Sequence, residues 1–193
     1  MYIDTVYVEH PLSLKAIHPS AKVPTKGTSD SACHDLSSVE KKVIGPHSTS
    51  IVKTGLKVEF IDNNFKLHIY SRSGLAAKKG VFVLNAPGVI DSDYRGELMV
   101  ILHNASDIPF DVEVGDRIAQ ISAEIAVKSE YIMQEFGSDN LITSEYTEKI
   151  VRGEGGLGST GVTTIPNINH QPLTADIQIV TAEGTITPSQ TLI

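Results

Sequence analysis

Cysteine is almost absent from the sequence. Cys33 is the single cysteine in 193 residues, which excludes an internal disulfide framework and any zinc site built from several cysteines. A chain with one thiol suits a reducing compartment, so we expect an intracellular, cytoplasmic protein.

Basic residues and long apolar runs are also scarce. The 16 Lys and Arg residues stand against 23 Asp and Glu residues, which gives a net charge of −7. No global positive field therefore attracts the chain to nucleic acid or to an anionic membrane. Residues 1–20 lack the basic and then apolar pattern of a signal peptide, and no apolar run reaches the roughly 18 residues of a membrane span. We expect a soluble, unprocessed protein that binds phosphate only at a local site.

Short strands dominate the first two thirds of the chain. Hydrophobic residues make up 40% of the sequence, enough for the core of one domain. Apolar and charged residues alternate in Leu56–Phe60, which is typical of a half-buried strand. Similar or more apolar runs, separated by turn residues, are Val43–Ile44, Ser50–Val52, Lys66–Tyr70, Val81–Leu84, Leu98–His103 and Arg117–Ile125. With one short helix at Ser73–Lys79, the pattern predicts an all-β sandwich, barrel or jelly roll.

The composition changes after residue 128. We predict a β core over residues 1–128, a linker with a flexible Gly-rich arm over 129–161, and an extra tail over 162–193. The tail contains no Lys or Arg, and its two Thr- and Ile-rich runs flank a Glu183-Gly184 turn signal, which predicts a small β-hairpin.

The Gly-rich stretch 152–161 resembles two nucleotide-binding loops only superficially. Its glycine spacing fits a Walker loop, but Ser159 occupies the position of the lysine. The same glycines fit a dinucleotide fingerprint, but Gly161 and Pro166 prevent the helix that must follow. Two interpretations remain open, a plain linker and a loop that folds its backbone N–H groups, Arg152 and hydroxyl groups over a phosphate chain.

Two further segments carry polar groups at turns. Residues 70–76 bring an arginine, a hydroxyl group and a glycine to the point where a strand passes into the short helix, as in a phosphate site or in a helix start capped by Ser71 or Ser73. In residues 85–97, turn residues bracket a short apolar piece that ends in Asp91, which is typical of a pocket-forming hairpin or of an ordinary hairpin with a solvated turn.

The order of these segments resembles the homotrimeric dUTP pyrophosphatase (dUTPase) family, from about residue 5 to residue 161. Any one match is weak, but five spaced matches in order are specific. The five matching segments are Ala32–Leu36, Arg72–Ala76, Gly88–Gly96, Gly115–Gln120 and Arg152–Gly161.

The resemblance implies a distorted jelly roll, or β-clip, that hydrolyses dUTP to dUMP and pyrophosphate with Mg²⁺. This reaction limits uracil in DNA and supplies dUMP for dTTP synthesis. By the same resemblance Asp91 is the general base that activates water, and Tyr94 packs against the deoxyribose and excludes a 2′-hydroxyl group. The residues implied in uracil binding are Asn85, Gly88, Val89, Ile90 and Met99.

The phosphate contacts follow from the other motifs. The residues implied are Arg72, Ser73, Gly74 and Gln120, together with Arg152, Ser159 and Thr160 from the arm. Two further arm residues, Leu157 and Gly158, are implied in substrate binding, with Leu157 at the position that covers uracil. Asp35 is expected to hold a water of the Mg²⁺ shell, so no direct protein ligand is expected. Three subunits of a homotrimer would share each site, with the arm from the third chain.

Three positions depart from the family pattern. Leu157 replaces an aromatic residue that stacks on uracil, Cys33 and His34 replace Gly-Tyr in the first motif, and Ser71 replaces Gly or Pro. The tail 162–193 has no family counterpart and leaves a protein partner open.

The alternatives include dCTP deaminase, which shares the fold but needs a catalytic Glu in the pocket. A dUTP-binding regulatory protein with weakened turnover is another, and a purely structural jelly roll is a third.

Overall fold

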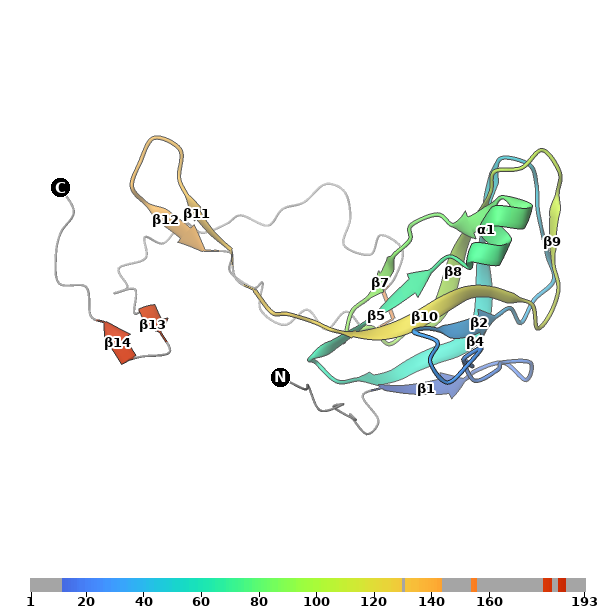
Figure 1. The fold of residues 1–193 in the computed structure, drawn as a ribbon, viewed down its shortest axis with the longest axis horizontal. Coiled ribbons are helices and arrows are strands. Elements are labelled where there is room, and N and C mark those ends of the chain that lie inside the picture. Colours follow the sequence, from blue (N-terminus) through green and yellow to red (C-terminus); the bar gives the residue numbers. More distant parts are fainter. Residues whose placement is uncertain (1–11, 130, 144–153, 156–178, 182–183, 187–193) are drawn as a thin grey trace. The chain divides into compact units, whose positions relative to one another are not determined.

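The computed structural model describes residues 12–129, 131–143, 154–155, 179–181 and 184–186 (Figure 1). Their elements are β1 (Leu12–Ala16), β2 (His34–Ser37), β3 (Lys42–Ile44), β4 (Ser48–Ile61), β5 (Phe65–Tyr70), α1 (Ser73–Lys79), β6 (Val81–Val83), β7 (Gly88–Ile90), β8 (Glu97–Asn104), β9 (Phe110–Val112), β10 (Arg117–Ile125), β11 (Ile132–Gln134), β12 (Leu141–Thr143), β13 (Ile179–Thr181) and β14 (Gly184–Ile186). The chain divides into two units, residues 1–128 with 150–162 and residues 129–149 with 163–193.

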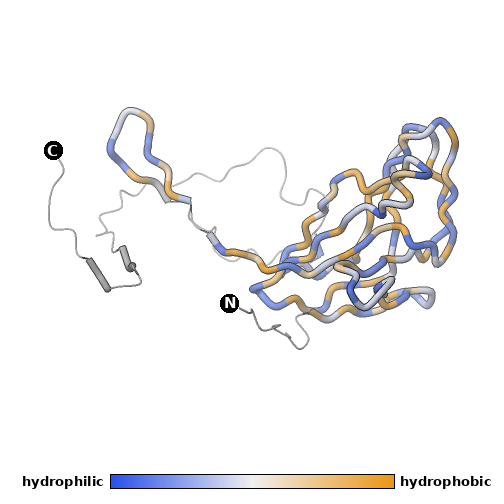
Figure 2. The backbone as a smooth tube through the Cα atoms, viewed as in Figure 1, coloured by the Kyte–Doolittle hydropathy of each residue, from blue (hydrophilic) through white to orange (hydrophobic). Residues whose placement is uncertain are grey.

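Two four-stranded sheets form the first unit. One has the order β1-β4-β8-β6 and the other β2-β10-β5-β7, all neighbours are antiparallel, and β3 pairs separately with β9. Apolar side chains of both sheets form one buried cluster, and hydrophobic residues recur along the strands of the first unit (Figure 2). Burial alternates in β8, where Leu98, Val100 and Leu102 are buried and the residues between them are partly exposed. The expected all-β class with one short helix is confirmed.

Strand β4 has a bulge where its register against β8 changes. The register between β4 and β8 shifts between Lys53 and Lys57, and Gly55 at the bulge has a φ of 65°. A Cβ at Gly55 would lie 2.7 Å from the Cβ of His18 and 2.9 Å from a methyl carbon of Val39. Glycine is therefore required here by both backbone conformation and packing.

The single helix of the described residues covers Ser73–Lys79 as predicted, but its start differs from the expected cap. Arg72 is the N-cap residue and makes no side-chain capping bond, so neither serine has the capping role. The Ser71 hydroxyl instead accepts a hydrogen bond from the Val83 N–H at 3.0 Å. The helix ends at Gly80, whose left-handed conformation lets its N–H reach the carbonyls of Ala76 and Leu75.

The second unit contains two small hairpins. β11 pairs with β12, and β13 pairs with β14 close to the turn signal at residues 183–184. The sequence pattern predicts a linker over residues 129–149, whereas the structure has the β11–β12 hairpin there. No helix within the described ranges has the length and apolar character needed to cross a membrane.

Asn104 is a buried polar residue whose side chain bonds to two loops, the β3–β4 turn and the β8–β9 loop. Its Nδ2 lies 3.0 Å, 3.2 Å and 2.8 Å from the carbonyl oxygens of Ile44, Gly45 and Ile108, and its Oδ1 accepts two bonds from Ser106. The Asn104→Ala change leaves these groups unpaired in a buried place, so we expect the free energy of unfolding to fall by about 2–4 kcal/mol.

Chemical denaturation at one fixed protein concentration measures this loss. Asn63→Ala is the control, because Asn63 is exposed and its replacement is expected to change stability by less than about 0.5 kcal/mol. Equal stabilities of the two variants would contradict the assigned role of Asn104.

Candidate active site

A small cavity lies between the ends of β5, β6, β7 and β8. Its volume is about 80 Å³, and one water needs about 10–15 Å³ on this measure, so the cavity has room for a small planar ring. The cavity is lined by Ile69, Val83, Asn85, Gly88, Val89, Ile90, Tyr94, Glu97, Met99, Val100 and Ile101. All five residues predicted for base binding, and Tyr94, therefore line one pocket.

Tyr94 forms a buried wall of this pocket. Its side chain is 6% exposed, and its hydroxyl group donates a hydrogen bond to the Glu97 carbonyl at 2.8 Å. A Cβ at Gly96 would lie 2.4 Å from the Tyr94 oxygen, so only glycine lets the ring lie in this position. Burial raises the pKa of Tyr94, and the charges of Glu97 and Glu154 raise it further.

The opposite wall combines backbone and an amide. A Cβ at Gly88 would lie 3.2 Å from the Asn85 Nδ2, so the amide lies against the backbone of β7. β7 is an edge strand of its sheet, and Gly88 pairs with Ile69 of β5 rather than within a hairpin, which corrects the hairpin expected for residues 85–97. The pocket thus offers amide and backbone hydrogen-bonding groups beside an apolar floor, a combination suited to a polar heterocycle.

Asp91 follows directly after β7, the edge strand that lines the pocket. The Asp91 backbone carbonyl accepts a hydrogen bond from the Tyr94 N–H at 3.1 Å, and Asp91 is exposed. The Arg95 guanidinium donates to the carbonyls of Ser92 and Tyr94 at 2.7 Å and 2.8 Å. These hydrogen bonds stabilise the loop of residues 91–95, and they keep the Asp91 backbone close to Tyr94.

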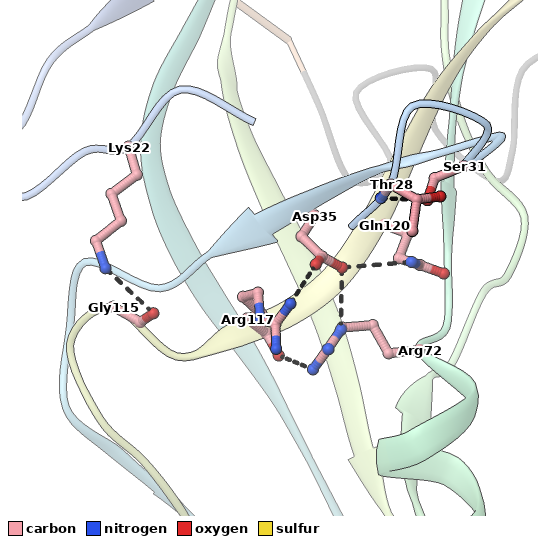
Figure 3. A network of polar contacts seen from close by, with 8 residues as sticks. All are labelled: Lys22, Thr28, Ser31, Asp35, Arg72, Gly115, Arg117 and Gln120. Atoms are coloured by element: carbon pink, nitrogen blue, oxygen red, sulfur yellow. Dashed lines mark hydrogen bonds and ion pairs between the residues drawn. The ribbon is translucent and has the colours of Figure 1, made fainter. Parts of the chain in front are cut away.

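A second cluster surrounds the Asp35 carboxylate (Figure 3). Asp35 is 7% exposed and accepts hydrogen bonds from Arg72 Nε at 3.1 Å and from Arg117 Nη1 at 2.9 Å. Gln120 Nε2 lies 3.3 Å from the same carboxylate, because Gln120 pairs with Asp35 across β10 and β2. The Arg72 Nη1 also donates to the Arg117 carbonyl at 2.9 Å.

Two guanidinium groups share one carboxylate in this cluster, so it keeps a net positive charge. Arg72 and Arg117, with Lys79 of α1, also line a neighbouring cavity of about 520 Å³, to which Asp111 and Asp116 contribute acidic groups. Ser73 and Gly74 are exposed in the first turn of α1, and the space around Gly74 is open. Such an arrangement can bind an anion of the size of a phosphate group.

Two sets of polar contacts are not indicated by the sequence pattern, one made by Arg117 and the other by Glu124. Arg117 belongs to the fourth matching segment, yet its contact with Asp35 was not foreseen. On the same sheet, Glu124 accepts hydrogen bonds from Tyr70 at 2.6 Å and from Ser122 at 3.0 Å, and its carboxylate lies 2.9 Å from His68 Nδ1. The bond from Tyr70 is the main cause that lowers the pKa of Glu124.

The predicted arm residues Arg152, Leu157, Gly158, Ser159 and Thr160 lie outside the described residues. Of the arm, the structure describes Glu154 and Gly155, and the Glu154 carboxylate contacts the Lys57 ammonium group. Among the described residues, no cluster of three or more His, Cys, Asp or Glu side chains is arranged to hold a metal ion.

Comparison with known proteins agrees with this geometry. The dUTPase family model matches residues 19–161. The chain belongs to the dUTPase family. It is 42% identical to the deoxyuridine 5′-triphosphate nucleotidohydrolase of Helicobacter pylori over 151 residues, which cover 78% of this chain and 97% of that protein. The protein of the same name from Wolinella succinogenes is 41% identical over 150 residues, 78% of this chain and 93% of the other.

Solved dUTPase structures have the same fold. The dUTPase from phage phi11 of S. aureus gives a TM-score of 0.59 at 22% identity, covering 67% of this chain and 99% of that chain. The dUTPase of Staphylococcus bacteriophage 80alpha with dUPNHPP gives a TM-score of 0.58 at 24% identity, covering 78% of this chain and 98% of that chain.

The raised pKa of Tyr94 predicts a specific loss of stability in alkali. The unfolded chain releases the phenol proton near pH 10, whereas the folded protein holds it to higher pH. The contribution of the neutral phenol is therefore complete below about pH 10 and is lost as the pH rises through the folded pKa. We expect the stability of Tyr94→Phe to fall less steeply above about pH 10 than that of the wild type.

Denaturant unfolding at a series of alkaline pH values measures these slopes. Tyr131→Phe is the control, because Tyr131 is 74% exposed, and we expect it to keep the wild-type slope. An identical slope for Tyr94→Phe and the wild type would show that Tyr94 titrates like an exposed tyrosine.

Proposed function

We propose that this dUTPase hydrolyses dUTP to dUMP and pyrophosphate by attack of an Asp91-activated water on the α-phosphorus. The observation that carries the proposal is the pocket lined by Asn85, Gly88 and Tyr94, because its size and polar groups suit a pyrimidine and Asp91 follows directly after its strand β7. The product would supply dUMP for dTTP synthesis, and removal of dUTP would limit uracil in DNA.

Uracil would enter the pocket and pair with backbone groups of Gly88, Val89 and Ile90 and with the Asn85 amide. These groups are fixed by the pairing of β7 with β5, so their order of donors and acceptors is set before binding. A cytosine would leave buried groups unpaired, which discriminates strongly. The small volume would also exclude the methyl group of thymine, and Met99 would contact the bound nucleotide.

Tyr94 would discriminate between sugars. Its ring is buried, and its hydroxyl group is bonded to the Glu97 carbonyl, so the ring has little freedom to move aside. With the ring against C2′ of the sugar, a 2′-hydroxyl group would collide with it. The close approach of the ring to Gly96 supports this role, since any larger residue would displace the ring.

Asp91 would act as the general base. A carboxylate is ionised at neutral pH, so it can orient a water and accept its proton while the water oxygen forms a bond to the α-phosphorus. The bond between the α-phosphorus and the bridging oxygen breaks, and pyrophosphate leaves with that oxygen. The exposed position of Asp91 after β7 supports access of a water to it.

The phosphate chain would lie against Arg72, Ser73 and Gly74, with Gln120 toward the α-phosphate. The Asp35 carboxylate holds Arg72 and Gln120 in place and would thereby preorganise the phosphate site. The preorganised positive charge would stabilise the charge that develops on the phosphates during attack.

The residues present fit a Mg²⁺ ion carried by the phosphates. Of about four acceptor positions on the Asp35 carboxylate, Arg72, Arg117 and Gln120 use three. One position is left for a water of the ion's shell, in keeping with the reluctance of Mg²⁺ to lose its waters. Bound Mg²⁺ would neutralise triphosphate charge. The structure of a phage phi11 dUTPase variant describes a structural Mg(II) ion.

The arm would complete the site. Arg152, Gly158, Ser159 and Thr160 would close over the β- and γ-phosphates, and Leu157 would cover the base without the flat face of an aromatic ring. We propose a homotrimer in which the pocket of one chain, the Asp35 cluster of another and the arm of the third form each site. No residue belongs to both the pocket and the Asp35 cluster. The two could therefore come from different chains, as the proposed homotrimer requires.

The Asp91→Asn change tests the general base. We expect pyrophosphate release from dUTP to fall by about 10²–10⁴-fold, with dUTP binding retained because the amide keeps the size of the side chain. Asp93→Asn, an exposed neighbour in the same loop, is the matched control and should keep wild-type turnover. Full turnover in Asp91→Asn would exclude this base.

The same assay, run against dCTP, dTTP and UTP, tests the reaction itself. Selective pyrophosphate release from dUTP is expected. Tight dUTP binding without release in the wild type would favour the regulatory protein, and ammonia release from dCTP would identify a deaminase.

A chain ended after Lys149 tests the arm. We expect a rate at least about 100-fold lower than that of a chain ended after Gly161, because the phosphates lose the groups that position them. Binding of dUMP, which depends mainly on the pocket, should fall much less than the rate. Equal turnover of the two truncated proteins would show that residues 150–161 do not serve catalysis.

A further inference from the structure

Lys57 lies on the strand behind the Tyr94 wall. It pairs with Glu97 across β4 and β8, and the next residue, Val58, donates its N–H to the Gly96 carbonyl at 3.1 Å. Lys57 thus lies on the strand next to the Gly96 backbone, against which the Tyr94 ring packs. Its side chain is about one third exposed, and the motif resemblance gives it no role.

Glu154 meets Lys57 at this place. Its carboxylate contacts the Lys57 ammonium group, and this contact lowers the pKa of Glu154. The negative charge of Glu154 in turn contributes to the raised pKa of Tyr94. The carboxylate therefore contacts Lys57 and lies close enough to the pocket wall for its charge to act on Tyr94.

We propose that Lys57 is a positioning residue that holds Glu154, and with it the beginning of the fifth motif, at the rim of the pyrimidine pocket. Glu154 stands three residues before Leu157, and three residues span at most about 11 Å. Holding Glu154 therefore limits how far Leu157 can lie from the pocket. The effect on turnover rests on the proposed function, whereas the pairing itself does not.

The exposure of the pair fits positioning better than support of the fold. The side chains of Lys57 and Glu154 are 33% and 71% exposed, and exposed ion pairs contribute little to stability and are screened by salt. Loss of the pair should therefore affect the arm more than the unfolding of the protein.

Charge reversal in the full-length protein tests the effect on turnover. We expect Lys57→Glu and Glu154→Lys each to lower kcat/KM for dUTP by about 3- to 10-fold at low salt, with unfolding unchanged. The double reversal should recover activity to within about twofold of the wild type, because it restores opposite charges. The loss in the single variants should shrink at about 1 M salt.

The pair of Lys15 and Glu59 provides the control. Its charged atoms lie 3.7 Å apart, its side chains are 61% and 49% exposed, and Glu59 is also on β4. The Glu59→Lys change should leave kcat/KM unchanged. A double reversal at Lys57 and Glu154 that is no better than the single variants would overturn the proposal.

Cross-linking tests the pairing without any assay of activity. In a Cys33→Ser background, Lys57→Cys combined with Glu154→Cys should form a disulfide on mild oxidation, whereas Lys15→Cys combined with Glu154→Cys should not. The contact in the structure lies within one chain, whereas the proposed homotrimer brings the arm to the pocket of another chain, so the pair would there join Lys57 of one subunit to Glu154 of another. A disulfide between chains would support both the pairing and this exchange of arms, and a disulfide within one chain would support the pairing and show that each arm folds onto its own pocket. No bond above the control level would overturn the pairing. Should the wild type fail to release pyrophosphate, the proposed function fails and this result still decides the pairing.

Discussion

The close packing of the Tyr94 ring on the backbone of Gly96 is the constraint on which much of the structure depends. The ring needs a residue without a Cβ beneath it, and its hydroxyl group is held by the Glu97 carbonyl. The Glu97 carboxylate in turn accepts the Gly55 N–H at 2.9 Å, at the bulge where β4 changes its register with β8. One aromatic side chain thus connects the pocket wall to the irregular point of the first sheet. A shift of the bulge would move the pocket, so the fold and the proposed sugar specificity are not separable here.

The second sheet contributes charge as well as part of the pocket wall. Asp35 is buried between two arginines, and burying a carboxylate is costly unless it is paired and hydrogen-bonded. Such a carboxylate is weak support for stability, but it fixes the guanidinium planes of Arg72 and Arg117. The register of β2 against β10, which sets Asp35 opposite Gln120, brings the third polar group to the same point. We infer that the cluster is retained because it orients phosphate-binding groups in advance.

Local patterns in the sequence predicted much of this, and non-local contacts account for most of what was missed. The alternation in Arg117–Ile125 predicts the whole of β10. The turn residues around Gly88 suggest a hairpin, but β7 pairs with β5, whereas β6 and β8 pair with each other in the other sheet. The contact of Arg117 with Asp35 depends on strands 82 positions apart in the chain, and nothing in the local pattern indicates it. The β11–β12 hairpin was missed for another reason. Its strands are three residues long, too short for an alternation to be recognised.

The Cys33-His34 departure from the first motif can now be judged from the structure. The position of Asp35 is set by its backbone, because its N–H donates to the Thr25 carbonyl at 2.7 Å and its strand neighbour is Gln120. Burial, together with the nearby Lys26 charge, lowers the pKa of His34 below its usual 6.5, so this side chain is neutral at neutral pH. It adds no third positive charge beside Arg72 and Arg117. The charge balance around the Asp35 carboxylate is therefore compatible with the unusual pair of residues that precedes it.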